Sequence, residues 1–397
     1  MIGLAICYDK HNYGSMLQAY ATQKVLDEAG IENEVINLCG LNRIINRRKR
    51  MYFIKAVLTS DFLGQKKGML LTKVRIKVGK GDFANNSKVR GYAYESFKNR
   101  MFHISIPFDS FDELTAYCGR EYRAVIVGSD QLWLPGNIAG DFYTLNFVPD
   151  KVGKIAYATS FGQDKLPLDI NEKATTFLNR IEHIGVREKT GQAIISELTG
   201  KKVPVVCDPA MLLTAEEWMN IQKEEPIIKG EYILCYFLGK NPKHRQWASK
   251  LRAVSECRIV GLLHLDEYVK SDEKYVDMSL YDVDPSDFLN LIRNAKYVCT
   301  DSFHCSLFSI LYHKDFFAFR RYAKKTEQST NSRLDTLFVE TGILRQILTG
   351  YEELDAITRV NINYTDVDKK VEKYRRNSMQ FLKNSLREEG IEFATVD

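Results

Sequence analysis

Short apolar segments that end in glycine or polar residues just before a helical pattern recur along this sequence, and this alternation strongly constrains the fold. Residues 2–7 form such a segment. They lead into a polar loop that contains Asn12 and Gly14, and then into a helical pattern over residues 16–29. With a strand predicted at residues 34–38, this is the first unit of a parallel α/β sheet. Ligands of such sheets bind at the carboxyl ends of the strands, so we expect Asn12 and Gly14 at a binding edge.

The same alternation predicts further strands and a second domain. The expected strands lie at residues 124–127, 155–159, 184–186, 203–207, 232–237, 258–263, 296–299 and 316–319. Because 397 residues are too many for one compact core, we expect two domains. The expected division is a first domain at 1–212 with a basic helical insertion at about 42–100, a linker at 213–230, a second domain at 231–360 and a C-terminal helix at 361–397.

Polar residues that follow the predicted strands, or that open a later helix, are candidates for a binding site. They are Ser129, Asp130, Gln131, Arg187 and Arg333. The two arginines are the most informative, because a planar guanidinium group suits a carboxylate or a phosphate. The alternative for Arg187 is a plain ion pair with a neighbour such as Glu188 or Asp208.

Residues 300–305 lie where a predicted strand ends and a helix begins, and they contain Asp301, Ser302 and His304. The free N–H groups at a helix start and the helix dipole favour an anion there. A histidine beside an anion site is a natural proton donor, since imidazole titrates near neutral pH. The alternative is structural: Asp301 or Ser302 caps the helix, and His304 packs in the core.

Composition narrows the class of protein. A content of 45% hydrophobic and 27% charged residues is ordinary for a soluble globular chain. The 8 cysteines lack zinc-type spacing, which predicts small buried thiols in a reducing cytoplasm and no metal site. The first apolar run is too short for a signal peptide, and no run approaches a membrane span. The loop with Gly14 shows neither a dinucleotide fingerprint nor a Walker pattern.

The positive charge is concentrated in one segment. Residues 42–100 hold 16 lysines and arginines against 3 acidic residues, a balance of +13, so the rest of the chain carries −8 of the net +5. The clusters are Arg47 to Arg50, Lys66-Lys67, and Lys73, Arg75 and Lys77. One interpretation is a solvated helical face. The other is a surface that meets an acidic glycan, a lipid head group or the inner face of a membrane. No nucleic-acid motif accompanies the segment, so we expect no nucleic acid as partner.

Six motifs occur in an order that resembles the polysaccharide pyruvyl transferase family and spans about residues 2–345. They are Asn12-Tyr13-Gly14 with residues 17–20, residues 128–133, residues 157–162, Val186-Arg187-Glu188, Asp208-Pro209 and residues 300–304. Each motif alone is weak, but the ordered set is specific. The basic segment is poorly matched.

The resemblance implies a fold like the B-type glycosyltransferases, with two Rossmann-like domains facing across a cleft. It also implies a cytoplasmic enzyme of exopolysaccharide, capsule or cell-envelope synthesis that needs no cofactor. The pyruvyl group of phosphoenolpyruvate would pass to a sugar, on a lipid-linked oligosaccharide or a polysaccharide, as a cyclic ketal. In the family the arginine of the Val-Arg-Glu motif is associated with phosphoenolpyruvate and the last histidine with catalysis; here these are Arg187 and His304.

The matching motifs extend the expected substrate-binding set, which is Asn12, Gly14, Ser129, Asp130, Gln131, Arg187, Asp301, Ser302 and Arg333. One departure concerns the last motif. Some members carry Arg-Leu-His where this chain has Ser302-Phe303-His304, and Arg333 is our candidate to replace that arginine. Two rival functions stay open: a glycosyltransferase of the same fold with a nucleotide-sugar donor, and a glycan-binding protein without activity.

Overall fold

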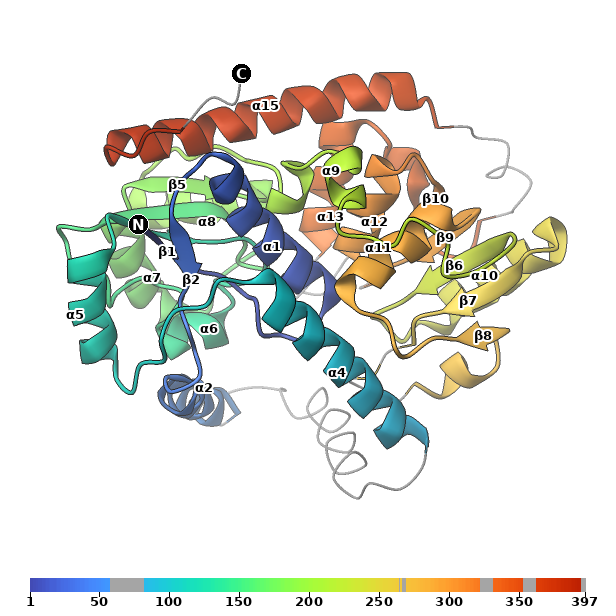
Figure 1. Ribbon diagram of the computed structural model, residues 1–397, viewed down its shortest axis with the longest axis horizontal. Coiled ribbons are helices and arrows are strands. Elements are labelled where there is room, and N and C mark those ends of the chain that lie inside the picture. The colour runs from blue at the N-terminus through green and yellow to red at the C-terminus, as the bar shows by residue number, and fades with distance from the viewer. Residues whose placement is uncertain (58–81, 264, 266–268, 322–330, 353–361, 394–397) are drawn as a thin grey trace.

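The computed structural model describes residues 1–57, 82–263, 265, 269–321, 331–352 and 362–393. Within them the chain forms two parallel sheets, which confirms the predicted α/β class (Figure 1). The basic clusters predicted at Lys66-Lys67 and at Lys73, Arg75 and Lys77 lie outside the described residues.

The first sheet has five strands in the order β2-β1-β3-β4-β5, all parallel. The strands are β1 Ile2–Ala5, β2 Asn33–Val35, β3 Ala124–Val127, β4 Gly153–Thr159 and β5 His183–Val186. Strands β1, β3 and β4 are buried along their whole length, as expected where helices cover both faces of a parallel sheet. The helices of this part are α1 Tyr13–Glu28, α2 Asn42–Val57, α4 Asp82–Met101, α5 Phe111–Glu121, α6 Pro135–Gly140, α7 Leu168–Arg180 and α8 Lys189–Thr199.

The strand predicted at residues 203–207 is wrong. The structure has only an isolated bridge there, between Val186 and Val205. Pro204 explains the difference, because proline has no N–H with which to continue a ladder. Its carbonyl still accepts from the N–H of Val186, and this places the following residues, including Asp208, at the carboxyl end of β5.

The second sheet has six strands in the order β11-β10-β9-β6-β7-β8, also parallel. The strands are β6 Tyr232–Tyr236, β7 Arg258–Gly261, β8 Met278–Ser279, β9 Tyr297–Thr300, β10 Asp315–Phe319 and β11 Ile347–Leu348. The two-residue strands at its edges were too short to predict. The remaining helices are α9 Ala215–Met219, α10 Pro242–Ser255, α11 Pro285–Asn294, α12 Phe303–Leu311, α13 Asn331–Thr341 and α15 Tyr364–Glu388, with 3-10 turns at Pro209–Met211, Lys270–Glu273 and Leu344–Gln346.

The two halves are joined by aromatic packing and by hydrogen bonds. The ring of Tyr13, at the start of α1, stacks on Phe288 of α11 with centroids 4.6 Å apart, and its hydroxyl donates to the carbonyl of Val283. Between the sheets, Trp218 of α9 is fully buried against Tyr20 and Phe308, so the segment predicted as a linker is firmly packed. These contacts hold the carboxyl ends of the two sheets toward each other.

Helix α15 returns from the second sheet to the first, and Figure 1 shows it running along one side of the molecule over both. Phe381 packs against Tyr157 of β4, and the hydroxyl of Ser378 accepts from the N–H of Cys207. Arg375 donates to the carbonyl of Met211. Among the helices of the described residues, none has the length and apolar character needed to cross a bilayer.

Candidate active site

Asp208 is the centre of a buried polar cluster between the two sheets. Its Oδ2 accepts from Ser129 Oγ at 2.8 Å and from Arg187 Nη1 at 2.6 Å. His304 Nε2, which comes from the other half of the molecule, lies 3.4 Å from the same oxygen. Burial raises the pKa of the Asp208 carboxyl, but His304 and Arg187 outweigh this effect and hold the pKa well below its usual range. Asp208 therefore stays ionised and joins the two halves electrostatically.

Arg187 follows β5 and is buried to 2% exposure. Its Nη1 donates to Asp208, so the ion pair that we considered as the alternative for Arg187 is present. Its Nε and Nη2, however, have no hydrogen-bond partner in the part of the chain that the structure describes. Burial lowers the pKa of this guanidinium, but Asp208, Asp130 and Glu188 together raise it, so the group remains a cation. The guanidinium also lies over the ring of Phe303, 4.7 Å from its centroid. Nε and Nη2 lie 4.0 Å from Glu188 Oε2 and 3.7 Å from Asp130 Oδ1, too far for a hydrogen bond, so both N–H groups can still donate to an anion.

Arg333 of α13 brings a second guanidinium to the cluster. Its Nη1 lies 3.8 Å from Asp130 Oδ1, and Arg187 Nη2 lies 3.7 Å from the same oxygen. Burial and the repulsion of Arg187 lower the pKa of Arg333 to about 10. Two cations held this close would be stabilised by an added anion, so Arg333 stays our candidate to replace the arginine missing from the last motif.

Asp130 and Glu188 complete the charge pattern. Ser15 Oγ donates to Asp130 Oδ2 at 2.6 Å, and Ser160 Oγ donates to Glu188 Oε1 at 2.8 Å. Burial raises the pKa of both carboxyls. At Asp130 the charges of Lys10, Arg187, His304 and Arg333 overcome that effect and depress the pKa, whereas at Glu188 burial prevails and the pKa is raised.

His304 lies in the first turn of α12, which Ser302 caps by accepting from the N–H of Cys305. Its ring rests directly on Gly14: a Cβ added to Gly14 would overlap Nδ1 and Cγ of His304. Nε2 faces the Asp208 side and has no hydrogen bond of good geometry to any described residue. Gly14 and His304, more than 280 residues apart in sequence, are therefore in van der Waals contact.

Not every predicted site residue joins this cluster. Asn12 caps α1 by accepting from the N–H of Ser15, and Ser302 caps α12. Asp301 accepts from the N–H groups of Leu238 and Gly239, at 2.7 and 2.8 Å, which ties β9 to the loop after β6. Gln131 packs against Gly162. These four residues shape the site rather than reach into the Asp208 cluster.

Sequence reasoning missed three residues that the structure places in the cluster: Asp208, Glu188 and Ser15. The first two lay inside motifs already singled out, but they were treated there as neighbours of Arg187. A signal was present for Asp208, which precedes a proline at the carboxyl end of a predicted strand. Ser15 gave none, because a serine that opens a helix usually caps it.

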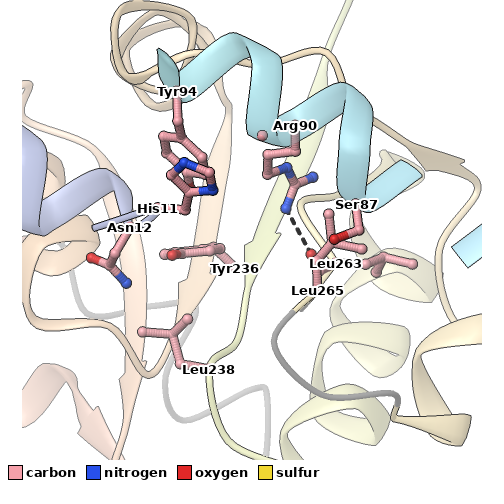
Figure 2. A pocket seen from close by; sticks show the side chains of 10 residues that line it. His11, Asn12, Ser87, Arg90, Tyr94, Tyr236, Leu238, Leu263 and Leu265 are labelled. Atoms are coloured by element: carbon pink, nitrogen blue, oxygen red, sulfur yellow. Dashed lines mark hydrogen bonds between the residues drawn. The ribbon is translucent and has the colours of Figure 1, made fainter. Parts of the chain in front are cut away.

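A cavity of about 70 Å³ that none of these cluster residues lines opens between α4 and the ends of β6 and β7 (Figure 2). Figure 2 shows His11 and Tyr94 side by side above Tyr236, with Asn12 at one margin. Arg90 of α4 closes the other side by donating to the carbonyls of Leu263, Leu280 and Tyr281. The basic segment thus contributes a helix that bonds to the second half of the molecule.

Comparisons with known proteins give the family and the fold. The family model described as polysaccharide pyruvyl transferase matches residues 12–321. No curated protein matches the chain. Among solved structures, UDP-N-acetylglucosamine 2-epimerase from Rickettsia bellii is similar at a TM-score of 0.52 and 10% identity, over 98% of this chain and 96% of that one.

Two further structures cover nearly the whole chain at lower scores. The UDP-N-acetylglucosamine 2-epimerase from Neisseria meningitidis has a TM-score of 0.46, 12% identity and coverage of 96% and 99%. MurG from Acinetobacter baumannii has a TM-score of 0.43, 9% identity and coverage of 98% and 99%. At such identities the Rickettsia protein shows the fold alone, two Rossmann-like domains as in B-type glycosyltransferases, and this confirms the predicted architecture.

Proposed function

The chain belongs to the polysaccharide pyruvyl transferase family, and from this premise we propose that it moves the pyruvyl group of phosphoenolpyruvate onto a sugar of a polysaccharide or of its precursor. Two sugar hydroxyls would end in a cyclic ketal, and phosphate would be released. The observation that carries the proposal is the convergence of Arg187, Arg333 and His304 on two ionised carboxylates between the sheets.

The donor carries a phosphate and a carboxylate, and both are groups that a guanidinium binds well. Arg187 offers Nε and Nη2, and Arg333 offers Nε, all buried and without a hydrogen-bond partner among the described residues. Buried donors of this kind are unfavourable unless a partner completes them. An anionic donor molecule would be that partner, so we assign donor binding to Arg187 and Arg333.

His304 is assigned as the proton donor. When its imidazole carries a proton, the ring forms an ion pair with Asp208, 3.4 Å from Nε2. Transfer of that proton to C3 of phosphoenolpyruvate makes a methyl group and leaves C2 electrophilic. One sugar hydroxyl adds to C2, phosphate leaves, and the second hydroxyl closes the ketal. Of the two hydroxyl protons, one restores His304 and the other leaves with the phosphate.

The test is donor choice. The protein is incubated with phosphoenolpyruvate and a panel of soluble and lipid-linked oligosaccharides, and phosphate release and product mass are measured. Parallel reactions contain nucleotide sugars in place of phosphoenolpyruvate. We expect phosphate release that depends on an acceptor, and a product that gains one pyruvyl ketal. Release of nucleotide with no phosphate from phosphoenolpyruvate would instead identify a glycosyltransferase.

A further inference from the structure

A larger cavity, of about 280 Å³, lies under helix α2 at the carboxyl edge of the first sheet. Its wall is formed by the loop after β1, by α2 and by the segment from Asp130 to Tyr143. Asp130 therefore belongs both to this cavity and to the guanidinium cluster of the candidate active site. A molecule in the cavity would be next to the groups that we assign to the donor.

The lining suits a carbohydrate. Amide groups of Asn42, Asn46, Gln131 and Asn137 border the cavity, and the rings of Phe142 and Tyr143 give it an aromatic side. Amides both donate and accept hydrogen bonds, as sugar hydroxyls require, and aromatic rings pack on the apolar face of a sugar. Ligand pockets run from roughly 300 Å³ upward, so this cavity is of a size for one sugar with a small substituent rather than for an oligosaccharide.

Helix α2 also contributes a basic residue, Lys49, to the lining of the cavity. Lys49 belongs to the basic cluster of the sequence, but its aliphatic stem packs along Gly140 and its side chain lines the cavity. No hydrogen bond or ion pair of Lys49 occurs within the described ranges. Burial lowers the pKa of this ammonium, and the ammonium of Lys10, which lines the same cavity, acts in the same direction. An anion beside Lys49 would relieve both effects.

The carboxylates of the cavity lining are those of Asp130 and Asp9. Arg187 and Arg333 face the Asp130 carboxylate, and although Asp9 acts to raise the pKa of Lys49, burial prevails. The backbone of Asp130 is unusual as well, with a φ of 78°, a left-handed conformation that a non-glycine residue adopts only when its surroundings impose it. Ser160 N–H and Leu132 N–H hold it by donating to its carbonyl.

We propose that this cavity is the acceptor subsite and takes a sugar that carries a phosphate or carboxylate group. Lys49 binds the anionic group, and the Asp130 carboxylate accepts a hydrogen bond from a sugar hydroxyl. The proposal rests on the proposed pyruvyl transfer, since it names the class of acceptor for that reaction. It also explains why one basic residue of α2 is directed away from solvent.

The test compares three forms of one sugar: the 1-phosphate, the uronic acid and the neutral sugar. Glucose, galactose and mannose each provide one such series. Binding to the full-length protein is measured by calorimetry, with and without phosphoenolpyruvate. We expect a charged member of one series to bind at least about tenfold more tightly than its neutral counterpart, the usual scale of one charge-assisted contact. A phosphate-only preference indicates a sugar phosphate or lipid-linked precursor, and a carboxylate-only preference an acidic polysaccharide.

Variants on one helix provide the controls. Lys49→Gln should abolish the preference and Lys49→Arg should retain it, whereas Arg50→Gln, which removes the same charge from the exposed face of α2, should leave it unchanged. Equal binding of neutral and charged sugars, an undiminished preference in Lys49→Gln, or no sugar binding at all overturns the proposal. Titration of the wild type with phosphoenolpyruvate separates the acceptor subsite from the proposed donor site. If phosphoenolpyruvate binds and no sugar does, the acceptor subsite alone is rejected. If a charged sugar binds and phosphoenolpyruvate does not, the donor assignment alone is rejected.

Discussion

Gly14 and His304 touch across the two halves of the molecule, and the missing side chain of Gly14 is what makes the contact fit. Nδ1 and Cγ of His304 occupy the space that a Cβ on Gly14 would need. On its other side the ring meets Phe303 edge to face, with centroids 5.1 Å apart. The position of the imidazole therefore depends on a residue of the first helix.

Gly14→Ala should inactivate the protein without unfolding it. The new methyl group must push the His304 ring aside, and a displacement of about 1 Å can lower turnover roughly a hundredfold. The measurement is phosphate release from phosphoenolpyruvate together with thermal unfolding. Gly119→Ala, in helix α5 far from the site and with no close contact, is the matched control and should retain full activity. Wild-type turnover in Gly14→Ala would show that the contact does not set the position of the ring.

His304→Ala should lower turnover by about a hundredfold or more, the usual contribution of general acid catalysis, while the protein stays folded. The control is His313→Ala, which removes an exposed histidine paired with Asp368 just beyond the same helix. Steady-state kinetics on both variants, with unfolding curves, gives the answer. An active His304→Ala protein would remove His304 from the mechanism.

Arg187→Lys should weaken donor binding although the charge is kept. Lysine cannot replace the Nε and Nη2 groups of the guanidinium, which both lack a hydrogen-bond partner among the described residues. A charge-assisted hydrogen bond contributes about 1.5–3 kcal/mol, so the dissociation constant should rise roughly tenfold to a hundredfold. Calorimetry with phosphoenolpyruvate measures it.

The matched control for that change is Arg245→Lys. Arg245 is equally buried, at 2% exposure, and its Nε donates to Asp272 at 2.6 Å in the second half of the molecule. It should lose stability but keep donor affinity. If both variants bind phosphoenolpyruvate as the wild type does, Arg187 is only structural.

The exposed part of the basic cluster should attract anionic membranes. Arg48 pairs with Asp141 and Lys49 reaches a cavity, so Arg47 and Arg50 are the residues directed to solvent. Each basic residue near an anionic surface contributes about 1 kcal/mol, and Arg47→Gln with Arg50→Gln should therefore lower liposome binding roughly thirtyfold. Co-sedimentation with anionic and neutral liposomes at low and high salt measures this.

The control pair is Lys373→Gln with Arg376→Gln, two exposed cations at the same helical spacing on α15. It should bind liposomes as the wild type does. Equal sedimentation of all three proteins, or binding that ignores lipid charge and salt, would leave the cluster as a solvated face.

Stability should fall as the pH drops from about 6.5 to 4 because of His244. Burial lowers the pKa of this histidine to about 4, with Arg245 and Arg321 acting in the same direction and Asp301 opposing. In this window the unfolded chain binds a proton that the folded chain excludes, so protonation favours unfolding. The full loss is about 3 kcal/mol. Urea unfolding at a series of pH values measures it.

His244→Gln should reduce the slope of stability against pH in that window, even though it lowers stability at pH 7. His103→Gln, at an exposed position, should leave the slope unchanged. A slope that His244→Gln does not alter would show that other groups cause the acid sensitivity.

Local pattern was enough to predict the sheets, because each strand end is marked by polar residues or glycine in the sequence itself. The strands predicted at residues 124–127 and 316–319 agree with the structure to within a residue, and Arg187 and His304 were placed correctly at a strand end and a helix start. The failure at residues 203–207 arose because four apolar residues outweighed one proline.

Contacts between distant parts of the chain could not be predicted in this way. Nothing near Asp208 in the sequence indicates that Ser129, Arg187 and His304 share one of its oxygens. The charge of residues 42–100 was visible at once, but the inward direction of Lys49 depends on how α2 packs against Gly140. Periodicity shows which face of a helix is apolar, not which long side chain bends toward a cavity.

The return of α15 to the first sheet has a consequence for synthesis of the protein. Phe381 and Ser378 contact β4 and the segment after β5, both made from the first half of the chain. A ribosome must therefore translate 171 further codons after Cys207, as far as Ser378, before that surface is covered. During this interval the nascent first half exposes an apolar face around Tyr157, which makes it a natural client for chaperones that bind emerging polypeptides.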